Sequence, residues 1–448
     1  MQPIEVETSE AETSGNQPSR PAWLSGLPEL RREIWILALG QLLLYIGQGF
    51  TLVYASIYFV NELGFSPTQV GLALGASGVA GIFGRIWVGY AIDSEFWGRR
   101  RTLMLAAVIP ALACFCLAVA DTFAWLVTGN LLLGLGLSIY WPANLAITTD
   151  LTTSANRMEA FALTRLVDNL GLGVGALLAG QYMAMSGNYS ILFLVKGLTY
   201  LLFGGVVFAA IAETRQPTTQ PRDLLQNWWQ ALSHRDLLTY LVANLCFTLY
   251  TAQQSSTLPL YLADFVAHGN RPTGFSEQWI SYFFAWHALL KIILQLPITR
   301  RLKALNNVLL LLIALAVWTG GFGLIWLTGI APTGAGLVAI AAFTCLALAE
   351  IIYSPASVAL VSELAPVDQR GIYFALDSQC WSIGFMVGPV LGGWALDHPE
   401  TLGADLWLWF VAGGGLAAVI LLWLRRQMAV NGTAAEEQAE EALVAERL

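Results

Sequence analysis

Charged side chains stand inside long apolar stretches of this sequence, where little water is expected. Arg165 and Asp168 are three residues apart, so on a helix they would share one face and be able to form an ion pair. Glu350 and Asp377 lie in two other apolar stretches. A charge at the centre of a bilayer costs roughly 2.5–3.5 kcal/mol on insertion scales, so such a group usually faces a partner or a cavity. These four residues are therefore the first candidates for chemistry.

Proton exchange is the chemistry that such carboxyl groups suit best. A carboxyl group moved from water into an apolar environment favours its neutral form, which brings its titration toward neutral pH. Glu350 has no evident partner nearby in the sequence, so we prefer it as the proton-exchanging group, with Asp168, Asp377 and Arg165 as further candidates. The alternative is structural: Arg165 and Asp168 would form a fixed pair, and Asp377 would face the cytoplasmic vestibule.

The elements that must position these groups are transmembrane helices, each of which needs about 20 mostly apolar residues. The sequence holds twelve such runs, at 34–60, 67–92, 102–120, 123–147, 159–185, 190–212, 237–263, 276–299, 306–328, 333–354, 371–397 and 404–424. Overall, 56% of the residues are hydrophobic and 12% are charged, against roughly 25% charged in soluble domains. The sequence therefore predicts an all-α membrane protein of twelve helices surrounded by the lipid bilayer.

Composition also argues against several classes of function. A net charge of −8 offers no basic face for nucleic acid. All five cysteines fall in apolar runs, so neither a disulfide framework nor a metal site is expected. The sequence contains no Gly-x-x-x-x-Gly-Lys-Ser/Thr motif for ATP, and we expect no cofactor. An enzyme would need a cluster of catalytic groups, and His287 is the only histidine inside a predicted helix.

Basic residues are distributed unevenly over the predicted loops. With both termini in the cytoplasm, 17 of the 22 Lys and Arg residues lie in cytoplasmic tails or loops, four lie within helices, and only Arg271 lies outside. An excess of Lys and Arg marks cytoplasmic loops. We therefore predict a multi-pass protein of the inner or plasma membrane with both termini cytoplasmic. Lys196, near the outer end of its helix, is expected to extend toward the interface.

An internal repeat divides the twelve runs into two sets of six. Residues 142–180 align without a gap to residues 355–393, with 13 identities in 39 positions and a constant offset of 213. Both copies have the same topology, so the halves would be parallel repeats about an axis normal to the membrane, as suits a carrier whose halves rock around a central site. The predicted organisation is a disordered cytoplasmic tail (1–32), a six-helix bundle (33–212), a cytoplasmic linker (213–236), a second six-helix bundle (237–426) and an acidic cytoplasmic tail (427–448).

The loop between the second and third predicted helices carries a motif of glycine, aspartate and arginine: Gly89, Asp93, Gly98, Arg99 and Arg100. Here the sequence resembles the major facilitator superfamily, whose hallmark is Gly-x-x-x-Asp-Arg-x-Gly-Arg-Arg/Lys. Ser94 stands at the usual Arg position, and two extra residues separate Asp93 from Gly98. The resemblance implies a cytoplasmic latch, in which the aspartate pairs with basic residues and with the positive N-terminus of the eleventh helix. We assign Asp150 and Arg370 to the same latch; the alternative is a topology signal alone.

Glycines also mark the fifth and eleventh helices. The eleventh fits Gly-x-x-x-Gly-Pro-x-x-Gly-Gly, with Gly384, Gly388, Pro389, Gly392 and Gly393. The fifth holds a degenerate copy, with Ala176 at the proline position. In the family this pattern marks exporters when it lies in the fifth helix, and small residues equally serve close helix packing. Asn130 stands where the family often has an arginine linked to proton coupling.

The resemblance covers residues 33–426, is closest to the twelve-helix drug/proton antiporter branch, and implies a substrate cavity between the halves. The candidates for the cavity are polar or aromatic: Gln41, Tyr45, Gln48, Tyr140, Trp141, Asn144, Tyr250, Gln254, Tyr353 and Trp381. Such groups can bind a solute by stacking and a few hydrogen bonds, or they can join helices to each other.

The sequence thus favours a monomeric secondary transporter that works by alternating access. Its expected task is proton-coupled efflux of amphipathic or drug-like small molecules. The alternative is a symporter or facilitator for a polar nutrient such as a sugar or an organic acid, and a remote alternative is a membrane scaffold that transports nothing.

Overall fold

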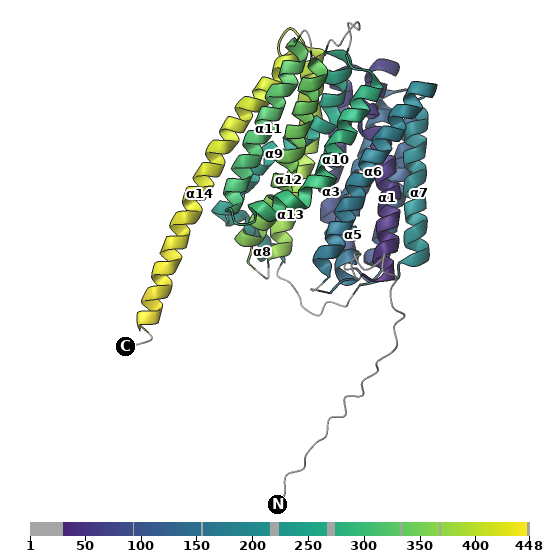
Figure 1. The fold of residues 1–448 in the computed structure, drawn as a ribbon. Coiled ribbons are helices and arrows are strands. Elements are labelled where there is room, and N and C mark those ends of the chain that lie inside the picture. The colour runs from purple at the N-terminus through teal and green to yellow at the C-terminus, as the bar shows by residue number, and fades with distance from the viewer. Residues whose placement is uncertain are drawn as a thin grey trace, which may run out of the picture.

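A computed structural model gives the fold, which consists of helices that run side by side in one bundle (Figure 1). It describes residues 30–445, apart from 93, 154–155, 216–223, 267–273, 332–333 and 367–368. The side chains of residues 158, 224–228 and 431–445 also lie outside the description.

The first half of the chain forms six long helical stretches. The first stretch is divided into α1 (Arg32–Leu52), α2 (Tyr54–Ile57) and a π-helical turn, η2 (Tyr58–Glu62). The other five are α3 (Pro67–Ala91), α4 (Gly98–Ala118), α5 (Phe123–Asp150), α6 (Arg157–Ser186) and α7 (Ser190–Ala210). All of them begin and end within a few residues of the predicted runs.

The second half forms six more long helices: α9 (Arg235–Asp264), α10 (Glu277–Leu302), α11 (Asn307–Ile330), α12 (Ala335–Leu364), α13 (Arg370–Asp397) and α14 (Leu406–Ala445), the last after a short turn, η3 (Gly403–Asp405). A short helix, α8 (Leu224–Ser233), lies in the predicted linker. Two helices run past their predicted ends. In α12 the apolar run ends before Pro355, but the helix continues to Leu364, and α14 extends out of the bundle (Figure 1).

Ten of the helical stretches that the structure describes are long and apolar enough to cross a membrane. Two further long helices, α9 and α13, fall outside that set, although they have 30 and 28 residues and pack within the bundle. Their polar residues explain the difference. α9 carries Asn244 and the candidate site residue Gln254, and α13 carries the candidate Asp377. Such groups inside a bundle usually mark a functional path.

Local sequence determines where several of these helices begin. A capping box begins α3. The Ser66 side chain accepts a hydrogen bond from the backbone amide of Gln69, and the Gln69 side chain accepts one from the backbone amide of Ser66. The Asn306 side chain caps α11 by accepting hydrogen bonds from the backbone amides of Val308 and Leu309. Each cap satisfies amides that have no partner within the helix.

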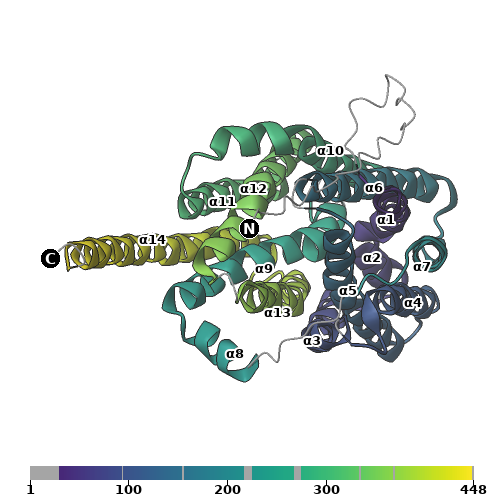
Figure 2. The ribbon, with the colours of Figure 1, turned by 90° about the horizontal axis from the view of Figure 1, so that it is seen from below.

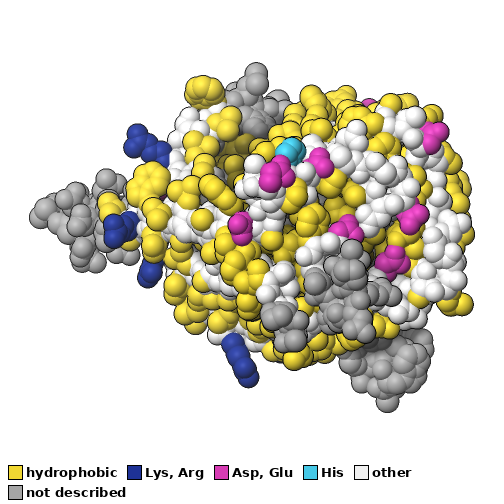
Figure 3. All heavy atoms as spheres, turned by 90° about the horizontal axis from the view of Figure 1, so that it is seen from above, with side chains coloured by type: hydrophobic (Ala, Val, Ile, Leu, Met, Phe, Trp, Pro, Cys, Tyr) yellow, Lys and Arg dark blue, Asp and Glu magenta, His cyan; other side chains and the backbone are white. Residues whose placement is uncertain are grey.

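The two ends of the bundle differ in charge. The end where both described termini leave the bundle (Figure 1) carries arginines of the first turn of α4 and of the last turn of α10, and we call it the basic end. The opposite end, which we call the acidic end, shows Asp and Glu side chains over its face, with Lys and Arg only at its margin (Figure 3). The acidic end carries Glu62, Asp264, Glu277, Asp397 and Asp405.

The two most extensive contacts between the halves are those of α3 with α13 and of α6 with α10 (Figure 2), and α2 also packs against α9. Glycines permit the first approach, because an added Cβ on Gly71 or Gly75 would meet the carbonyl oxygen of Pro389 or Met386. The predicted packing glycines of α13 face two ways. A Cβ added at Gly384, Gly388 or Gly392 would meet α9, at Thr248, Ala252 and Thr257 respectively. A Cβ added at Gly393 would instead meet Pro67 of α3.

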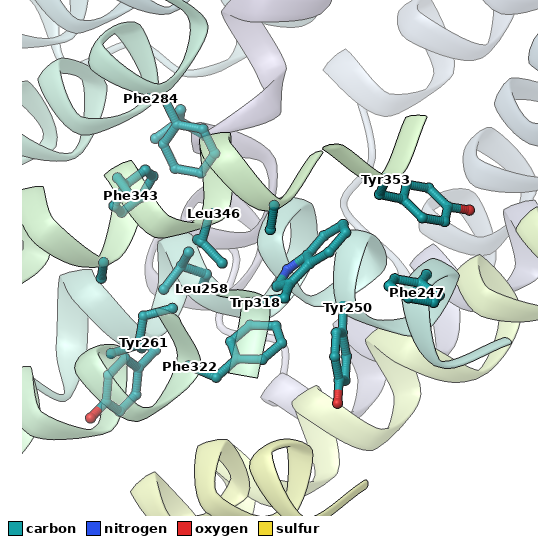
Figure 4. Close-up of a cluster of buried hydrophobic side chains, with 14 of the residues drawn as sticks. Phe247, Tyr250, Leu258, Tyr261, Phe284, Trp318, Phe322, Phe343, Leu346 and Tyr353 are labelled. Atoms are coloured by element: carbon teal, nitrogen blue, oxygen red, sulfur yellow. The ribbon is translucent and has the colours of Figure 1, made fainter. Parts of the chain in front are cut away.

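Aromatic rings fill the core of the second half. Trp318 of α11 is fully buried and lies 5.9 Å, between ring centroids, from both Tyr250 and Tyr353 (Figure 4). Phe247 stacks on Tyr353 at 4.6 Å. This packing holds α9, α11 and α12 together as one unit behind the candidate site.

Candidate functional site

Glu350 lies at the midpoint of α12 and is held by two basic side chains of α10. Its Oε2 accepts from Lys291 Nζ at 2.6 Å, and its Oε1 lies 3.4 Å from His287 Nε2. The amide of Gln254 on α9 lies 3.0 Å from the same histidine nitrogen. No partner for Glu350 was evident from the sequence, because Lys291 is 59 residues away along the chain. The carboxyl group is 14% exposed, so it is an ion-paired and nearly buried group.

Arg165 and Asp168 are brought together less closely than their spacing predicts. The Arg165 guanidinium lies over the ring of Trp141, 5.0 Å from its centroid, and no ion pair to Asp168 is found among the described contacts. Asp168 is 5% exposed, and its Oδ1 has no hydrogen-bond partner. The aromatic face of Trp141 holds the guanidinium by a cation–π contact, and Arg165 acts on Asp168 at longer range.

Asp377 is instead satisfied by hydrogen bonds from neutral groups. Its Oδ1 accepts from the Tyr240 hydroxyl and from Asn244 Nδ2, both at 2.8 Å. The Tyr353 hydroxyl donates in turn to Asn244 Oδ1 at 2.7 Å. This network joins α9, α12 and α13 within the second half, so Asp377 has a clear structural role.

The two halves repeat one polar arrangement. In the first half, Gln41 Nε2 of α1 donates to the Tyr140 hydroxyl of α5 at 3.1 Å. In the second half, the Tyr353 hydroxyl of α12 donates to Asn244 of α9. Tyr140 and Tyr353 are separated by the same 213 residues as the repeat. Extending that alignment by two positions toward the N-terminus would have revealed this pairing.

The remaining cavity candidates fall into two groups. Tyr45 and Trp141 meet edge to face at 6.2 Å, and Trp141 is 38% exposed, so its ring is accessible to a solute. Gln48 donates to the Tyr200 hydroxyl, Asn144 is buried, and Trp381 stacks on Phe385.

Tyr250, another cavity candidate, lies in the aromatic core of the second half. Its side chain is 2% exposed, and its hydroxyl donates to the Phe410 carbonyl of α14 at 2.5 Å. The ring packs against Phe322 and Trp318 in the core (Figure 4).

Lys196 differs from expectation. It is 5% exposed and donates to Thr51 at 2.9 Å, so it does not extend to the membrane surface.

The predicted latch residues gather at the basic end, although Asp93 lies outside the described residues. Gly98 begins α4 with a positive φ of 61°, and the amides of Arg99 and Arg100 donate to the Glu213 carboxylate at 3.0 and 3.2 Å. Arg99 also forms an ion pair with Asp150 of α5.

The other two latch candidates show no such contacts. Gly89 has open space around its Cα, and Arg370 is exposed at the start of α13. Glu213, which caps α4, carried no motif in the sequence and was missed.

Hydrogen bonds between the halves concentrate at the acidic end. The Tyr54 hydroxyl lies 2.5 Å from Ser281 Oγ and 3.0 Å from the Glu277 carbonyl oxygen, and Tyr189 donates to the Glu277 carboxylate. Two more such bonds are Asn61 to Asp264 at 3.0 Å and Thr68 to Asp397 at 2.6 Å.

At the basic end, two of the described polar contacts stay within one half: Arg99 of α4 with Asp150 of α5, and Asn307 of α11 with Glu363 of α12. Further along the interface, Arg85 of α3 donates to Ser382 of α13. Among the described contacts, hydrogen bonds between the halves are therefore more frequent at the acidic end.

Comparison with known proteins adds independent evidence. The sequence model of the Major Facilitator Superfamily matches residues 37–269 and 268–447, which together cover most of the chain. Among curated proteins, a Na(+), Li(+), K(+)/H(+) antiporter of Planococcus maritimus is 23% identical, over 81% of this chain and 89% of the antiporter. Multidrug resistance protein MdtH of Yersinia enterocolitica is 25% identical, over 89% of this chain and 95% of MdtH.

Solved structures of transporters share the fold at lower sequence identity. The nucleoside transporter NupG superposes with a TM-score of 0.74 and 13% identity, over 88% of this chain and 99% of NupG. The peptide transporter PepTSo superposes with a TM-score of 0.72 and 13% identity, over 90% of this chain and 99% of that one. At this identity the likeness concerns the fold alone.

Proposed function

Since this chain belongs to the Major Facilitator Superfamily, we propose that it exports amphipathic, drug-like solutes in exchange for protons. Membership confirms three predictions: the fold of two six-helix bundles, a role in transport, and the absence of an enzymatic role. The names of the relatives, a cation/proton antiporter and a multidrug resistance protein, support proton coupling and efflux.

The observation that carries the proposal is the ion-paired Glu350 at the centre of the bundle. A carboxylate at this depth is costly unless it is paired, and here Lys291 and His287 pair with it. Uptake of a proton neutralises the carboxylate and loosens both contacts. Glu350 can therefore link proton binding to the arrangement of α10 and α12, which Asp377, satisfied by neutral donors, is less suited to do.

Alternating access gives each end of the bundle a role. We take the contacts at the acidic end to close the path between the halves on that side, and the basic end to be the side from which a solute enters in this state. Trp141, which is 38% exposed, offers an aromatic surface to a solute that enters from the basic end. We take the Gly98–Arg99–Asp150 cluster to belong to the latch that closes the basic end in the opposite state.

The orientation is part of the same proposal. Excess Lys and Arg face the cytoplasm in membrane proteins, so we place the basic end and both termini in the cytoplasm and the acidic end outside. We place the protein in the inner or plasma membrane as a monomer, since each copy contains both halves needed for one transport path.

The experiment uses purified protein in proteoliposomes with an imposed pH gradient. Uptake of ethidium, an amphipathic cation, is measured for the wild type, for Glu350→Gln and for Glu363→Gln. Glu363 is the matched control, because it lies on the same helix but is exposed and bonds only to Asn307 among the described contacts. We expect gradient-driven uptake in the wild type and the control and its loss in Glu350→Gln. Unchanged uptake in Glu350→Gln would refute the assignment.

A second candidate function is exchange of monovalent cations for protons, favoured by the relative named as a Na(+), Li(+), K(+)/H(+) antiporter. The same vesicles test it by adding sodium, lithium or potassium and following dissipation of the pH gradient with a fluorescent dye. Dissipation by these ions without ethidium transport would replace the leading proposal. A sugar or organic acid as the only transported solute would favour the symporter alternative.

A further inference from the structure

Asp168 is a buried carboxyl group that proton exchange at Glu350 leaves unused. It is 5% exposed, and Oδ1 has no hydrogen-bond partner. The arginine three residues earlier is engaged with Trp141. A buried carboxylate without a partner is strongly unfavourable. Asp168 is therefore expected to meet a proton or a positive charge at some stage of the cycle.

The packing of α6 against α10 places such a charge at nearly the same height in the bundle. The two helices run antiparallel: an added Cβ on Gly180 would meet Ser281, and one on Gly173 would lie 3.1 Å from Ala288 Cβ. Asp168 lies five residues from Gly173 toward the basic end, and Lys291 lies three residues from Ala288 in the same direction. At about 1.5 Å per residue, the two Cα positions differ in height by only about 3 Å.

The charge and the flexibility of Lys291 agree with this alignment of α6 and α10. Two positive charges act on Asp168: Arg165 of the same helix, and Lys291, which belongs to the other half. Its ammonium group sits on a flexible four-carbon stem and is now bound to Glu350. Lys291 is 20% exposed, so it has room to move.

The other groups around Lys291 are few. On α10 itself there is His287, and α12 contributes Glu350. The groups around Asp168 are Arg165 on its own helix, Tyr45 of α1 and Tyr140 of α5. The α9 neighbour of His287, Gln254, is a neutral amide, and residues 307–330 of α11 include no titratable side chain. On α13, Asp377 is bound to Tyr240 and Asn244.

We propose that Lys291 changes partners across the interface between the halves: it binds Glu350 when that carboxylate is ionised and Asp168 when Glu350 is neutral. The inference rests on the proposed proton exchange at Glu350 and deepens it. Loss of the charge on Glu350 frees the ammonium group, and the unpaired carboxylate of Asp168 is the charged acceptor at the same level. Asp168 is then a positioning residue: when Glu350 is neutral, the bond between Asp168 and Lys291 holds α6 against α10.

The position of the new contact predicts a direction of movement. Gly173 and Gly180 already meet α10 on the acidic-end side of Asp168. A bond from Lys291 to Asp168 would add a contact on the basic-end side, so it would draw the halves together there. Neutral Glu350 therefore favours a closed basic end.

The test measures a distance across the basic end without substrate or gradient. Spin labels are placed at Phe96 in the first half and Leu305 in the second, both exposed, and distances are recorded in lipid nanodiscs at pH 8. Glu350→Gln should raise the ratio of short to long distances about fivefold or more, the lower range of coupling between sites. Asp168→Asn in the same background should abolish that rise, and the conservative Asp168→Glu should retain it. Elution as a single peak with native helicity verifies that each variant folds.

The outcomes separate this inference from the proposed function. A rise in Glu350→Gln that persists after Asp168→Asn, or a lengthening of the distance, overturns the partner exchange even if Glu350→Gln abolishes ethidium transport. Unchanged ethidium transport in Glu350→Gln overturns the proposed function, whatever the distances show. Lys291→Gln adds a further requirement: in that background the distance should no longer respond to Glu350→Gln.

Discussion

The close approach of α3 and α13 makes a quantitative prediction about Gly78. A Cβ added there would lie 2.7 Å from the Cα of Met386 and still closer to the Met386 amide nitrogen and the Ser382 carbonyl oxygen. All three are backbone atoms, so no side-chain rotation relieves the clash, and the halves must separate locally. Overpacking of this kind costs about 1–3 kcal/mol.

The matched variant is Gly205→Ala, since nothing lies within 4 Å of a Cβ at Gly205 in α7. Both changes gain the same helix propensity, roughly 1 kcal/mol, so the difference between them isolates the clash. We expect Gly78→Ala to be less stable than Gly205→Ala by about 1–3 kcal/mol, measured by unfolding in mixed micelles with increasing denaturing detergent. Equal stability, or greater stability of Gly78→Ala, would refute the packing argument.

Two further predictions concern polar contacts. Asp150→Asn removes an ion pair at the basic end in which the two side chains are 17% and 14% exposed, so it should lower the free energy of unfolding by about 1–3 kcal/mol. Glu95→Gln should leave unfolding unchanged, because Glu95 is 92% exposed. Tyr240→Phe removes one of the two donors to Asp377 and should cost about 1–3 kcal/mol in the same assay; no loss would show that water or another group replaces the hydroxyl.

The helices themselves were predictable from the sequence because a bilayer demands long apolar runs. The errors lie where a helix leaves the lipid. The predicted run ended at residue 354, before Pro355, yet α12 continues to Leu364. A proline within a membrane helix is tolerated when neighbouring groups satisfy the freed carbonyl, so it marks no end. The linker helix α8 was missed because it is too short for the same criterion.

The candidate site was predictable in its members but not in its pairings. Spacing suggested Arg165 with Asp168, because residues three apart share a helix face, but a cation–π contact with Trp141 competes for the guanidinium. Glu350 looked isolated, because its partners come from another helix. Only tertiary packing brings such residues together. The correspondence between Tyr140 and Tyr353 was the exception, since the 213-residue offset of the repeat already relates these two positions.

The central claim is that the charge on Glu350 couples protons to transport, and the most direct measurement is ethidium transport driven by a pH gradient in proteoliposomes. The account predicts that the wild type and Glu363→Gln respond to the gradient, while Glu350→Gln still binds ethidium but no longer responds. Gradient-driven transport by Glu350→Gln at the wild-type rate would contradict it.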